Sequence, residues 1–347
     1  MTYTKPLVTV ICLCYNHANY LEEALTSIFD QTYPSLEMIW VDDASTDQSV
    51  AIMQKVLASC PQELRSKIKA TLWLPTNQGN CKAFNKALAM AAGKYVIDFA
   101  TDDKLLPHHI AAMVQAFETL PESYALLYAN AYLMNDRGKI YQCYYQVDKH
   151  QKAKPPPPSG QVYVPLLAQS WICAPTTVFR KQALQTIGGY PEHFSFEDWP
   201  TWLALAKNHQ FQYIDQIGVI YRQTTGSKTQ RMYALPPNQH LQDCLQICQD
   251  IVSEQLSEPE KQAFWHRLRY FVRLSFYTHH FALAAAFGSL LKKINGLNLT
   301  TNIWLWLASR QVKVNRLYRF YSYLRYTITP FLVKLFRCKT HEYKSAH

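Results

Sequence analysis

The first 120 residues alternate between short apolar runs and segments in which apolar positions recur at helical spacing. A short, almost continuous apolar run is typical of a strand that is buried on both faces of a parallel sheet. Such runs lie at 7–14, 36–41, 68–74 and 95–100. Helical spacing predicts helices over 18–29, 42–57, 79–92 and 107–120. This strict alternation predicts an α/β fold, a doubly wound, mostly parallel sheet flanked by helices, with right-handed crossovers.

The pattern changes twice further along the chain. The middle section is less regular, and its predicted elements are strands at 124–129 and 176–179, a hairpin over 132–147, and helices over 181–187 and 197–207. Four consecutive prolines at 155–158 predict an extended surface loop. From about 236 the pattern is helical. We therefore expect a first domain over 1–235 and a helical region over 236–347.

The composition excludes a disordered chain, because 48% of the 347 residues are apolar and only 17% are charged. The net charge of +10 is unevenly distributed. Residues 261–347 hold 15 Lys and Arg and one acid, Glu342, whereas the first 260 residues hold 20 bases and 24 acids. The C-terminal region is therefore a basic helical extension, and its excess charge favours a polyanionic partner.

Bases and aromatic residues are interleaved in this extension, for example over 267–277 and 316–326. Amphipathic helices of that composition are typical of anionic membrane interfaces. Three alternatives are a helical subdomain packed on the first domain, an oligomerisation region, and a nucleic-acid-binding segment. We favour the membrane and expect no nucleic-acid partner.

The spacing of the cysteines and the hydropathy of the chain indicate the cellular compartment of the protein. The nine cysteines form no C-x-x-C pair, and no signal peptide precedes the first strand. No window of 18 apolar residues predicts a membrane-spanning helix. We therefore expect a cytoplasmic protein, peripheral on the cytoplasmic face of the membrane. His240, Cys244 and Cys248 share one helical face, which could present metal ligands, but we favour a half-buried face of small apolar thiols.

Polar side chains follow the predicted strands, where ligands of doubly wound sheets bind. They lie at 15–17, 42–43, 77–79 and 101–103. The sequence contains neither G-x-G-x-x-G nor a Walker A motif, which excludes a glycine loop as the phosphate cradle. The adjacent Asp102 and Asp103 could instead hold a divalent cation that bridges to a diphosphate. The alternative is a pair of acids at the start of the next helix.

Several of these pieces together resemble the inverting glycosyltransferases of family 2, which have the GT-A fold. The similar segments are 6–16, 27–34, 40–47, 77–79, 92–95, 100–103 and 196–206. They occur in order, and the resemblance covers roughly residues 5–228. It implies a donor-binding half over about 1–105 and an acceptor half over about 106–235.

The resemblance also implies roles for individual residues. Asp198 would be the general base, Asp103 with Asp102 would bind Mn²⁺ or Mg²⁺, and Glu197 and Trp199 would lie on the acceptor side. The donor nucleotide would be bound by Tyr15, Asp43, Asn77, Lys82, Asp102 and Arg222. Tyr15 would stack on uracil, and Asp43 would accept its ring N–H. For Trp202, on the same helix as Asp198, we favour a place in the core over contact with a sugar.

The expected function is transfer of a hexosyl or N-acetylhexosaminyl group from a UDP-sugar to a hydroxyl of a glycan or lipid-linked acceptor, in surface polysaccharide biosynthesis. Two departures from the family pattern keep an alternative open. Ala100 stands where the family usually has an acid, and Thr224 stands where it often has a histidine. The alternative is a non-catalytic GT-A-like protein that binds nucleotide or glycan and docks to membrane through its basic tail. The C-terminal helices could also form an oligomer.

Overall fold

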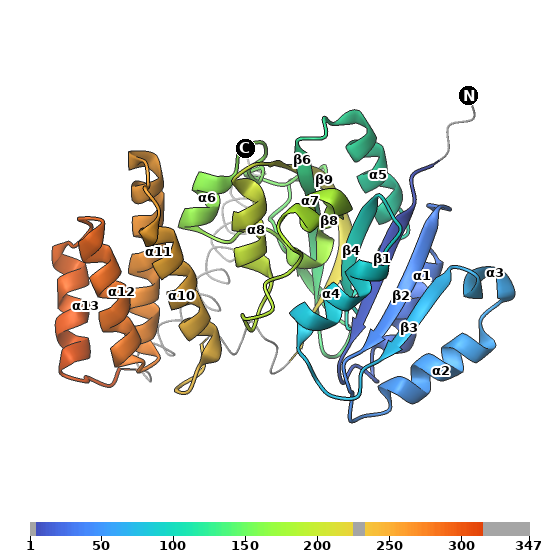
Figure 1. The fold of residues 1–347 in the computed structure, drawn as a ribbon, viewed down its shortest axis with the longest axis horizontal. Helices are drawn as coiled ribbons and strands as arrows, with labels where there is room; N and C mark the ends of the chain where they lie inside the picture. Colours follow the sequence, from blue (N-terminus) through green and yellow to red (C-terminus); the bar gives the residue numbers. More distant parts are fainter. Residues whose placement is uncertain (1–4, 225–232, 315–347) are drawn as a thin grey trace, which may run out of the picture. The chain divides into compact units, whose positions relative to one another are not determined.

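The computed structural model describes residues 5–224 and 233–314, and the chain divides into two compact units. Unit 1 holds residues 1–230 and 257–264, and unit 2 holds residues 231–256 and 265–347 (Figure 1). The domain boundary predicted after residue 235 remains a prediction.

The first half of unit 1 is a parallel sheet. Its strands are β1 (Val8–Cys14), β2 (Leu36–Asp42), β3 (Ile68–Trp73) and β4 (Tyr95–Ala100), in the order β3-β2-β1-β4. Cys14 pairs with Asp42, and Leu13 pairs with Ala100, so three strands end at the same edge. Every residue of β1 is buried, which explains its continuous apolar run. These strands confirm the predicted parallel α/β sheet.

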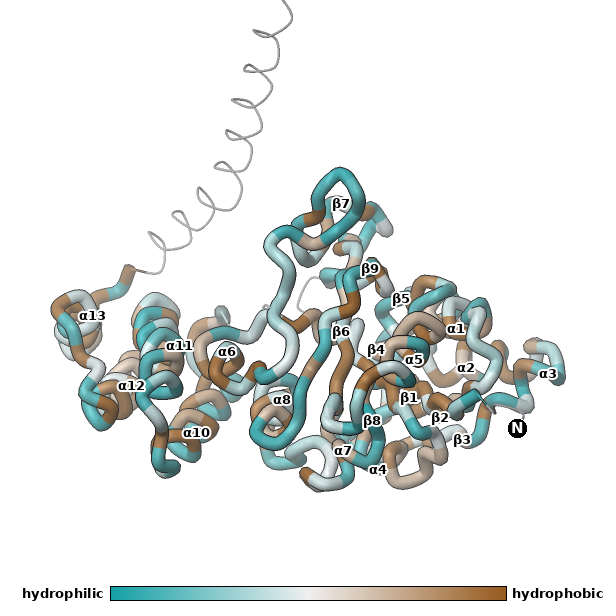
Figure 2. The backbone as a smooth tube through the Cα atoms, turned by 90° about the horizontal axis from the view of Figure 1, so that it is seen from above, coloured by the Kyte–Doolittle hydropathy of each residue, from teal (hydrophilic) through white to brown (hydrophobic). Residues whose placement is uncertain are grey.

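Helices cover both faces of this sheet (Figure 1). They are α1 (Leu21–Phe29), α2 (Ser49–Ser59), the short α3 (Gln62–Arg65), α4 (Asn80–Met90) and α5 (His109–Thr119). Val10 and Cys12 of β1 share one apolar core with residues of α1 and α5. The chain in this core is brown along β1 and β4 in Figure 2, which colours residues by hydropathy.

The helix predicted over 42–57 begins seven residues later than expected, at Ser49. Residues 43–48 form a loop instead, because acidic side chains accept hydrogen bonds from its backbone. Asp42 Oδ2 accepts from the Ser45 amide at 2.9 Å, and Asp47 Oδ1 accepts from the Ser49 amide at 2.9 Å. Ala44 has a φ of 59°, which a helix does not permit. The loop thus replaces the first predicted turns.

The second half of unit 1 extends the same sheet with antiparallel and parallel strands. They are β5 (Lys104–Leu105), β6 (Tyr124–Asn135), β7 (Ile140–Cys143), β8 (Val178–Arg180) and β9 (Gln210–Gln223). β8 runs antiparallel to β4 and β6, while β6 and β9 are parallel. The whole order is β3-β2-β1-β4-β8-β6-β9-β5, and β7 pairs with β6 to form the predicted hairpin.

Short helices connect these strands. They are α6 (Tyr163–Ala168), the 3-10 turn η1 (Ala174–Thr176), α7 (Lys181–Thr186) and α8 (Asp198–Ala206). The predicted helices over 181–187 and 197–207 are therefore present with nearly the expected bounds. Gly188 and Gly189 follow α7 with φ near 80°, which only glycine adopts readily at the end of a helix.

Unit 2 consists of helices in its described part. They are α10 (Gln239–Ser253), most of α11 (Glu258–Tyr277), α12 (Phe281–Lys293) and α13 (Leu299–Ser309). Phe271 stacks on Phe287, with ring centroids 4.9 Å apart. Cys244 and Cys248 are buried with the apolar face of α10, as the preferred interpretation of that face predicts. None of the helices described for this chain is long and apolar enough to cross a membrane.

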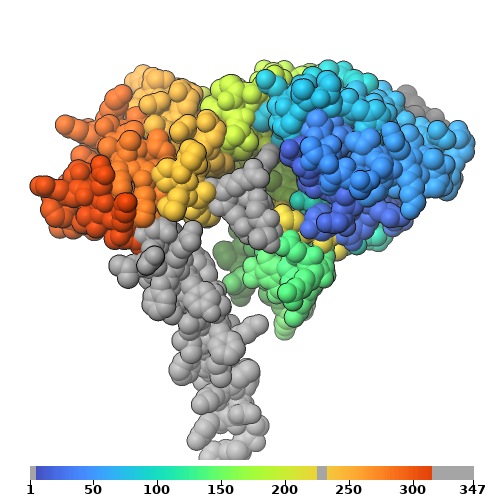
Figure 3. Space-filling model, turned by 90° about the horizontal axis from the view of Figure 1, so that it is seen from below, coloured from blue at the N-terminus to red at the C-terminus, as the bar shows by residue number. Residues whose placement is uncertain are grey.

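One face of α13 is apolar and exposed. Leu299 is 77%, Ile303 47% and Trp306 59% exposed, and their spacing places them on one side of the helix. Figure 3 shows α13, in orange-red, at the surface of unit 2. The basic and aromatic segment over 316–326 lies outside the described residues.

Candidate active site

Three loops that follow β1, β2 and β4 interlock at the carboxyl edge of the sheet. From the loop after β1, the amide of Asn16 donates to Ser45 Oγ at 2.9 Å, and that of His17 donates to Ser49 Oγ at 3.0 Å. The Ala18 amide donates to Asp47 Oδ2 at 3.0 Å. The hydroxyls and carboxylate of one loop thus satisfy the backbone of its neighbour and hold both in place.

Asp43 connects a fourth loop to this edge. Its two carboxylate oxygens accept hydrogen bonds from the amides of Gln78 and Gly79, each at 2.8 Å. Asn77 Nδ2 donates to the Asp43 carbonyl at 3.2 Å. Asp43 is only 6% exposed, whereas Tyr15 is 45% exposed. The four polar segments that the sequence predicts to converge therefore lie together, with a fixed carboxylate and an open aromatic ring among them.

The adjacent Asp102 and Asp103 have different environments. The Asp102 side chain is 21% exposed, and its Oδ2 lies 3.9 Å from His17 Nε2. Asp103 is 2% exposed, and its Oδ1 accepts the Arg222 amide at 2.7 Å. Burial, and then the neighbouring Asp102 charge, raise the pKa of Asp103 well above its usual range. Asp102 is thus the accessible acid, and Asp103 ties the end of β9 to this loop.

The Arg222 side chain makes its contacts with other residues of unit 1. Its Nε donates to the Asp102 carbonyl at 2.9 Å, its Nη2 pairs with Glu23, and its guanidinium lies 4.3 Å from the Tyr20 ring centroid. The side chain of Arg222 is nearly fully buried. The structure therefore gives Arg222 internal partners where the sequence predicts a nucleotide contact. Lys82, on the first turn of α4, is exposed.

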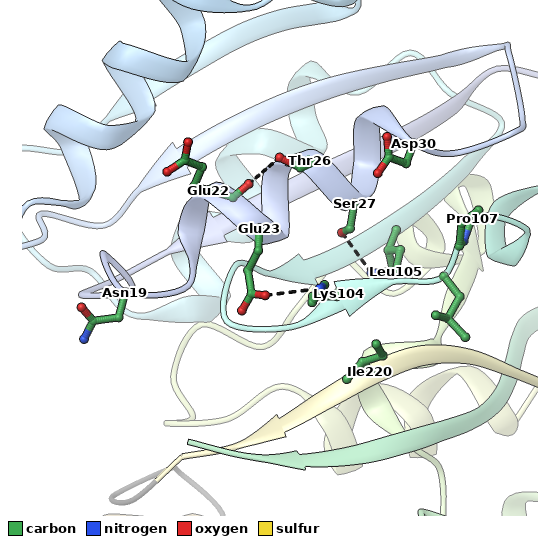
Figure 4. A pocket seen from close by; sticks show the side chains of 11 residues that line it. Asn19, Glu22, Glu23, Thr26, Ser27, Asp30, Lys104, Leu105, Pro107 and Ile220 are labelled. Atoms are coloured by element: carbon green, nitrogen blue, oxygen red, sulfur yellow. Dashed lines mark hydrogen bonds and ion pairs between the residues drawn. The ribbon is translucent and has the colours of Figure 1, made fainter. Parts of the chain in front are cut away.

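A groove of about 640 Å³ lies beside Glu23, between α1 and β5 (Figure 4). Glu22, Glu23 and Asp30 contribute acids to its lining, and Lys104 Nζ lies 3.2 Å from Glu23 Oε2. The predicted site residues are absent from this lining. The sequence pattern does not predict the groove, because residues of α1 and residues near 105, which are far apart in the sequence, line it together.

Asp198 is the first residue of α8, and Glu197 precedes it. Burial raises the pKa of the Cys173 thiol, and the Asp103 and Asp198 carboxylates raise it further. Cys173 is fully buried, and both Asp103 and Asp198 interact electrostatically with its thiol. The two carboxylates therefore lie near the same buried residue of unit 1. The predicted base and one of the two predicted metal-binding acids thus lie within electrostatic range of the same buried thiol.

An accessible aromatic residue near Asp198 is Tyr144, to which the sequence pattern assigns no role. The residue is 36% exposed. Burial of the hydroxyl raises the Tyr144 pKa, and the Cys173, Tyr221 and Asp198 charges add to this effect. Trp199 is instead 3% exposed and donates from Nε1 to the Leu166 carbonyl at 3.0 Å, so its ring belongs to the core. Trp202 is also buried, which confirms the preferred interpretation for that residue.

A preformed metal cage is absent from the described residues, where no three His, Cys, Asp or Glu side chains converge as ligands. The oxygen donors that follow β4 at this edge are the carboxylates of Asp102 and Asp103. Mg²⁺ is commonly bound by one or two carboxylates together with substrate phosphates and water. The donor set therefore fits an ion that arrives with a diphosphate, and does not fit a closed structural site.

Comparison with known proteins identifies the family. The model of Glycosyl transferase family 2 matches residues 9–169. A Bacillus subtilis protein named as a teichuronic acid biosynthesis glycosyltransferase, TuaG, is 32% identical over 208 residues, which cover 60% of this chain and 75% of the relative. An uncharacterised glycosyltransferase of Nostoc is 34% identical over 112 residues, or 32% of this chain and 33% of the relative.

Solved structures share the fold. Staphylococcus aureus TarS 1–349 in complex with UDP-GlcNAc superposes with a TM-score of 0.62 at 20% identity, over 88% of this chain and 87% of that chain. The mannosyltransferase PcManGT of Pyrobaculum calidifontis, in complex with GDP-Man and Mn²⁺, gives a TM-score of 0.54 at 16% identity, over 96% and 87%. These similarities confirm the GT-A architecture that the resemblance implied. The chain belongs to glycosyl transferase family 2.

Proposed function

We propose that this glycosyltransferase moves a hexosyl or N-acetylhexosaminyl group from a UDP-sugar to a hydroxyl of a glycan or lipid-linked acceptor, with inversion at the anomeric carbon. The observation that carries the proposal is the convergence of Tyr15, Asp43 and Asp102 at one sheet edge, with Asp198 and Asp103 bordering Cys173. TuaG, named for teichuronic acid synthesis, supports a surface polysaccharide as the product. TarS in complex with UDP-GlcNAc supports a uridine nucleotide.

The donor base binds between Tyr15 and Asp43 in this proposal. The exposed Tyr15 ring offers a surface on which a uracil ring can stack. Each Asp43 oxygen accepts one backbone amide and retains a second acceptor position, which suits the N–H of uracil. Asn77 holds the loop that fixes this carboxylate. The exposed Lys82 remains a proposed contact for the diphosphate.

Asp102 and Asp103 would hold Mn²⁺ or Mg²⁺ together with the diphosphate of the donor. Asp102 offers an accessible hard oxygen ligand at the carboxyl end of β4. A bound divalent ion would neutralise the negative charge that develops on the departing UDP.

Asp198 acts as the general base. It takes the proton of the acceptor hydroxyl while that oxygen bonds to the anomeric carbon, and the bond from this carbon to the diphosphate breaks. A single displacement of this kind inverts the anomeric configuration, so one base suffices. At the N-terminus of α8, the helix dipole stabilises the ionised carboxylate that the reaction requires.

The acceptor lies against Tyr144 and Glu197 in this proposal. The Tyr144 ring is exposed, and its shielded hydroxyl end feels the Asp198 charge. An aromatic face beside the base can pack on the apolar face of a sugar and orient its hydroxyl. Trp199, which the sequence analysis assigned to this side, supports α8 from within the core.

The Asp198→Asn variant tests the reaction. We expect transfer to fall by about 10²–10⁴-fold, because the amide cannot take the proton, while UDP affinity stays within about twofold. The Asp250→Asn variant on the exposed face of α10 is the matched control and should keep full activity. NMR of the product should show an inverted anomeric centre.

The outcomes separate the alternatives. Full turnover by Asp198→Asn would refute its role as the base, and a retained anomeric configuration would refute the single displacement. A wild-type protein that binds UDP yet transfers no sugar from a broad donor panel would favour the non-catalytic GT-A-like binding protein.

Unit 2 attaches the enzyme to an anionic membrane surface in this proposal. The exposed face of α13 presents Leu299, Ile303 and Trp306, and Arg310 lies 6.0 Å from the Trp306 ring centroid. Exposed apolar and aromatic side chains next to cations are typical of interfacial helices. A lipid-linked acceptor would be presented at the same surface.

A further inference from the structure

We propose that His17 supplies a nitrogen ligand, Nε2, to the divalent ion that Asp102 binds. This inference rests on the metal-dependent donor site proposed above and deepens it. The sequence pattern assigns His17 no role, and the family resemblance implies only the two carboxylates, Asp102 and Asp103, as metal ligands.

The positions of the two side chains allow one ion to contact both. His17 Nε2 lies 3.9 Å from Asp102 Oδ2. Two ligand atoms can share an ion when their separation is below about 4.2 Å, which is the sum of two bonds of about 2.1 Å. The side chains are 22% and 21% exposed, so an ion and the phosphates that accompany it can reach them from solvent.

The hydrogen bonds of His17 leave Nε2 as the nitrogen without a proton. The Thr101 hydroxyl is buried and donates its hydrogen to the Leu13 carbonyl at 3.0 Å. Thr101 Oγ1 therefore accepts from His17 Nδ1, 3.0 Å away, and Nδ1 carries the proton of the neutral ring. The opposite tautomer would give up one of these two bonds and place an Nε2 proton at a long 3.9 Å from the carboxylate.

This tautomer points the Nε2 lone pair toward a carboxylate oxygen. Two electron-rich atoms that face each other repel, unless a cation lies between them. A divalent ion between His17 Nε2 and Asp102 Oδ2 would remove this repulsion. Histidine ligands commonly donate their other N–H to an oxygen that fixes the ring, and Thr101 does this for His17.

The backbone around His17 is also fixed. The His17 amide donates to Ser49 Oγ at 3.0 Å, and its carbonyl accepts from the amides of Tyr20 at 2.9 Å and Leu21 at 3.0 Å. Asp47 is the other nearby acid, and its oxygens accept from the amides of Ala18 and Ser49. The ring is therefore held in place before an ion arrives, as a ligand should be.

A nitrogen ligand changes which ion the site prefers. Imidazole suits Mn²⁺ and later transition metals better than Mg²⁺, which favours oxygen ligands. We therefore expect the protein to bind Mn²⁺ more tightly than Mg²⁺, and this preference to depend on His17.

The test uses Mn²⁺ as the probe, with the full chain and UDP present. Electron paramagnetic resonance measures free Mn²⁺, and pulsed measurements detect ¹⁴N coupling to the bound ion. His17→Asn can retain the hydrogen bond to Thr101 but has no atom at Nε2. His17→Gln can place an oxygen there. His150→Asn, in an exposed loop, is the matched control.

We expect ¹⁴N coupling in the wild type and in His150→Asn, and none in His17→Asn. Mn²⁺ affinity should fall about 10–100-fold in His17→Asn. His17→Gln should lose the coupling and shift its preference toward Mg²⁺, and thermal unfolding of each variant verifies that it is folded. Tight Mn²⁺ binding without ¹⁴N coupling in the wild type, or equal affinity in His17→Asn, would overturn the role of His17. Failure of the wild type to bind Mn²⁺ would overturn the metal-dependent donor site itself.

Discussion

At the scale of single residues, the Asp43 carboxylate holds the loop at 78–79 and is also the proposed acceptor for the N–H of uracil. Asp43→Asn would turn one acceptor oxygen into an NH₂ group facing the amide of Gln78 or Gly79. We expect a loss of about 1–3 kcal/mol of unfolding free energy, and weaker UDP binding. Denaturant titration and calorimetry with UDP measure the two effects.

Asp148 provides the matched comparison for this variant. Its Oδ1 accepts from the amides of His150 at 2.8 Å and Lys152 at 3.1 Å, in a loop outside the proposed donor site. Asp148→Asn should therefore cost stability without loss of UDP affinity. Unchanged UDP affinity in Asp43→Asn would contradict the proposed contact with the base.

Tyr144 is predicted to act on the acceptor alone. Tyr144→Ala removes the exposed ring beside Asp198 and should raise the acceptor KM several-fold, with little change in the KM for the UDP-sugar. Tyr144→Phe keeps the ring and should behave like the wild type. Tyr141→Ala is the control, because Tyr141 is 49% exposed on the same hairpin. Steady-state kinetics separate the two substrates, and an effect of Tyr144→Ala on the donor alone would disprove this assignment.

The positions of three predicted site residues follow from chain order alone, and their roles remain predictions. Tyr15, Asp43 and Asp102 each follow a strand, and parallel neighbours bring such residues to one edge. Arg222 and Trp199 could not be placed in this way, because their positions depend on distant partners. Arg222 pairs with Glu23, 199 residues away, and Trp199 donates to the Leu166 carbonyl, 33 residues away.

At the scale of elements, α5 packs tightly on β9 at Gly218. A Cβ atom on residue 218 would lie 2.1 Å from His109 Nδ1, which is too close for two atoms that are not bonded to each other. Gly218→Ala should therefore destabilise unit 1 by about 1–3 kcal/mol. In the double variant with His109→Ala the clash is absent, so a double-mutant cycle should give a coupling energy above about 1 kcal/mol. Additive effects would contradict this packing.

His109 also predicts a dependence of stability on pH. Burial lowers its pKa from 6.5 to about 4. The unfolded chain therefore takes up a proton below about pH 6.5, while the folded protein resists it until about pH 4, so stability falls as the pH decreases through this window. The loss between pH 7 and pH 5 is about 2 kcal/mol.

Denaturant unfolding of the wild type and of His109→Leu at pH 7 and pH 5 measures this contribution. The variant should lose about 2 kcal/mol less than the wild type over that range. An equal pH dependence of the two proteins would show that His109 is not buried in its neutral form.

Elements were predictable where a single pattern governs a segment. β1, β2 and β4 are largely buried and therefore appear as continuous apolar runs, and the helices between them appear as helical spacing of apolar residues. β9 was not predicted, because polar residues alternate along it, and its register depends on β6, with irregularities near Ala129 and Asn130. β5 has only two residues, too few to leave a pattern.

At the scale of the whole molecule, unit 2 should bring the full chain to anionic vesicles. Leu299→Ser combined with Trp306→Ser removes two apolar side chains from the exposed face of α13 and should weaken cosedimentation with phosphatidylglycerol-containing vesicles by about tenfold or more. Binding should also fall with added salt and be weak on neutral vesicles.

Trp73→Ser is the control for this experiment, because Trp73 is 38% exposed on β3 of unit 1 and should not contribute. Equal vesicle binding by the double variant and the wild type would refute α13 as the docking face. If sedimentation velocity instead shows that the double variant dissociates a wild-type oligomer, the face is an interface between copies of the chain.

The excess of positive charge in the C-terminal region was evident from composition, but the contacts of each Lys and Arg side chain were not. Arg267 is 7% exposed, and Arg269 lies 4.4 Å from the Trp265 ring centroid and donates to Thr300 and Thr301. Some bases of the extension therefore hold unit 2 together, as a helical subdomain would require. Which bases pack and which face solvent depends on tertiary contacts that no local pattern encodes.

The proposed function requires a metal-dependent site for a uridine nucleotide at the carboxyl edge of the sheet. The most direct test is thermal unfolding of the full chain with UDP, GDP and CMP, each with Mn²⁺ and again with EDTA, because a ligand that binds the native state raises its apparent stability. We predict that UDP with Mn²⁺ raises the Tm, and that EDTA removes most of this effect. Stabilisation by GDP in preference to UDP, or by no nucleotide at all, would contradict a donor site for a uridine nucleotide.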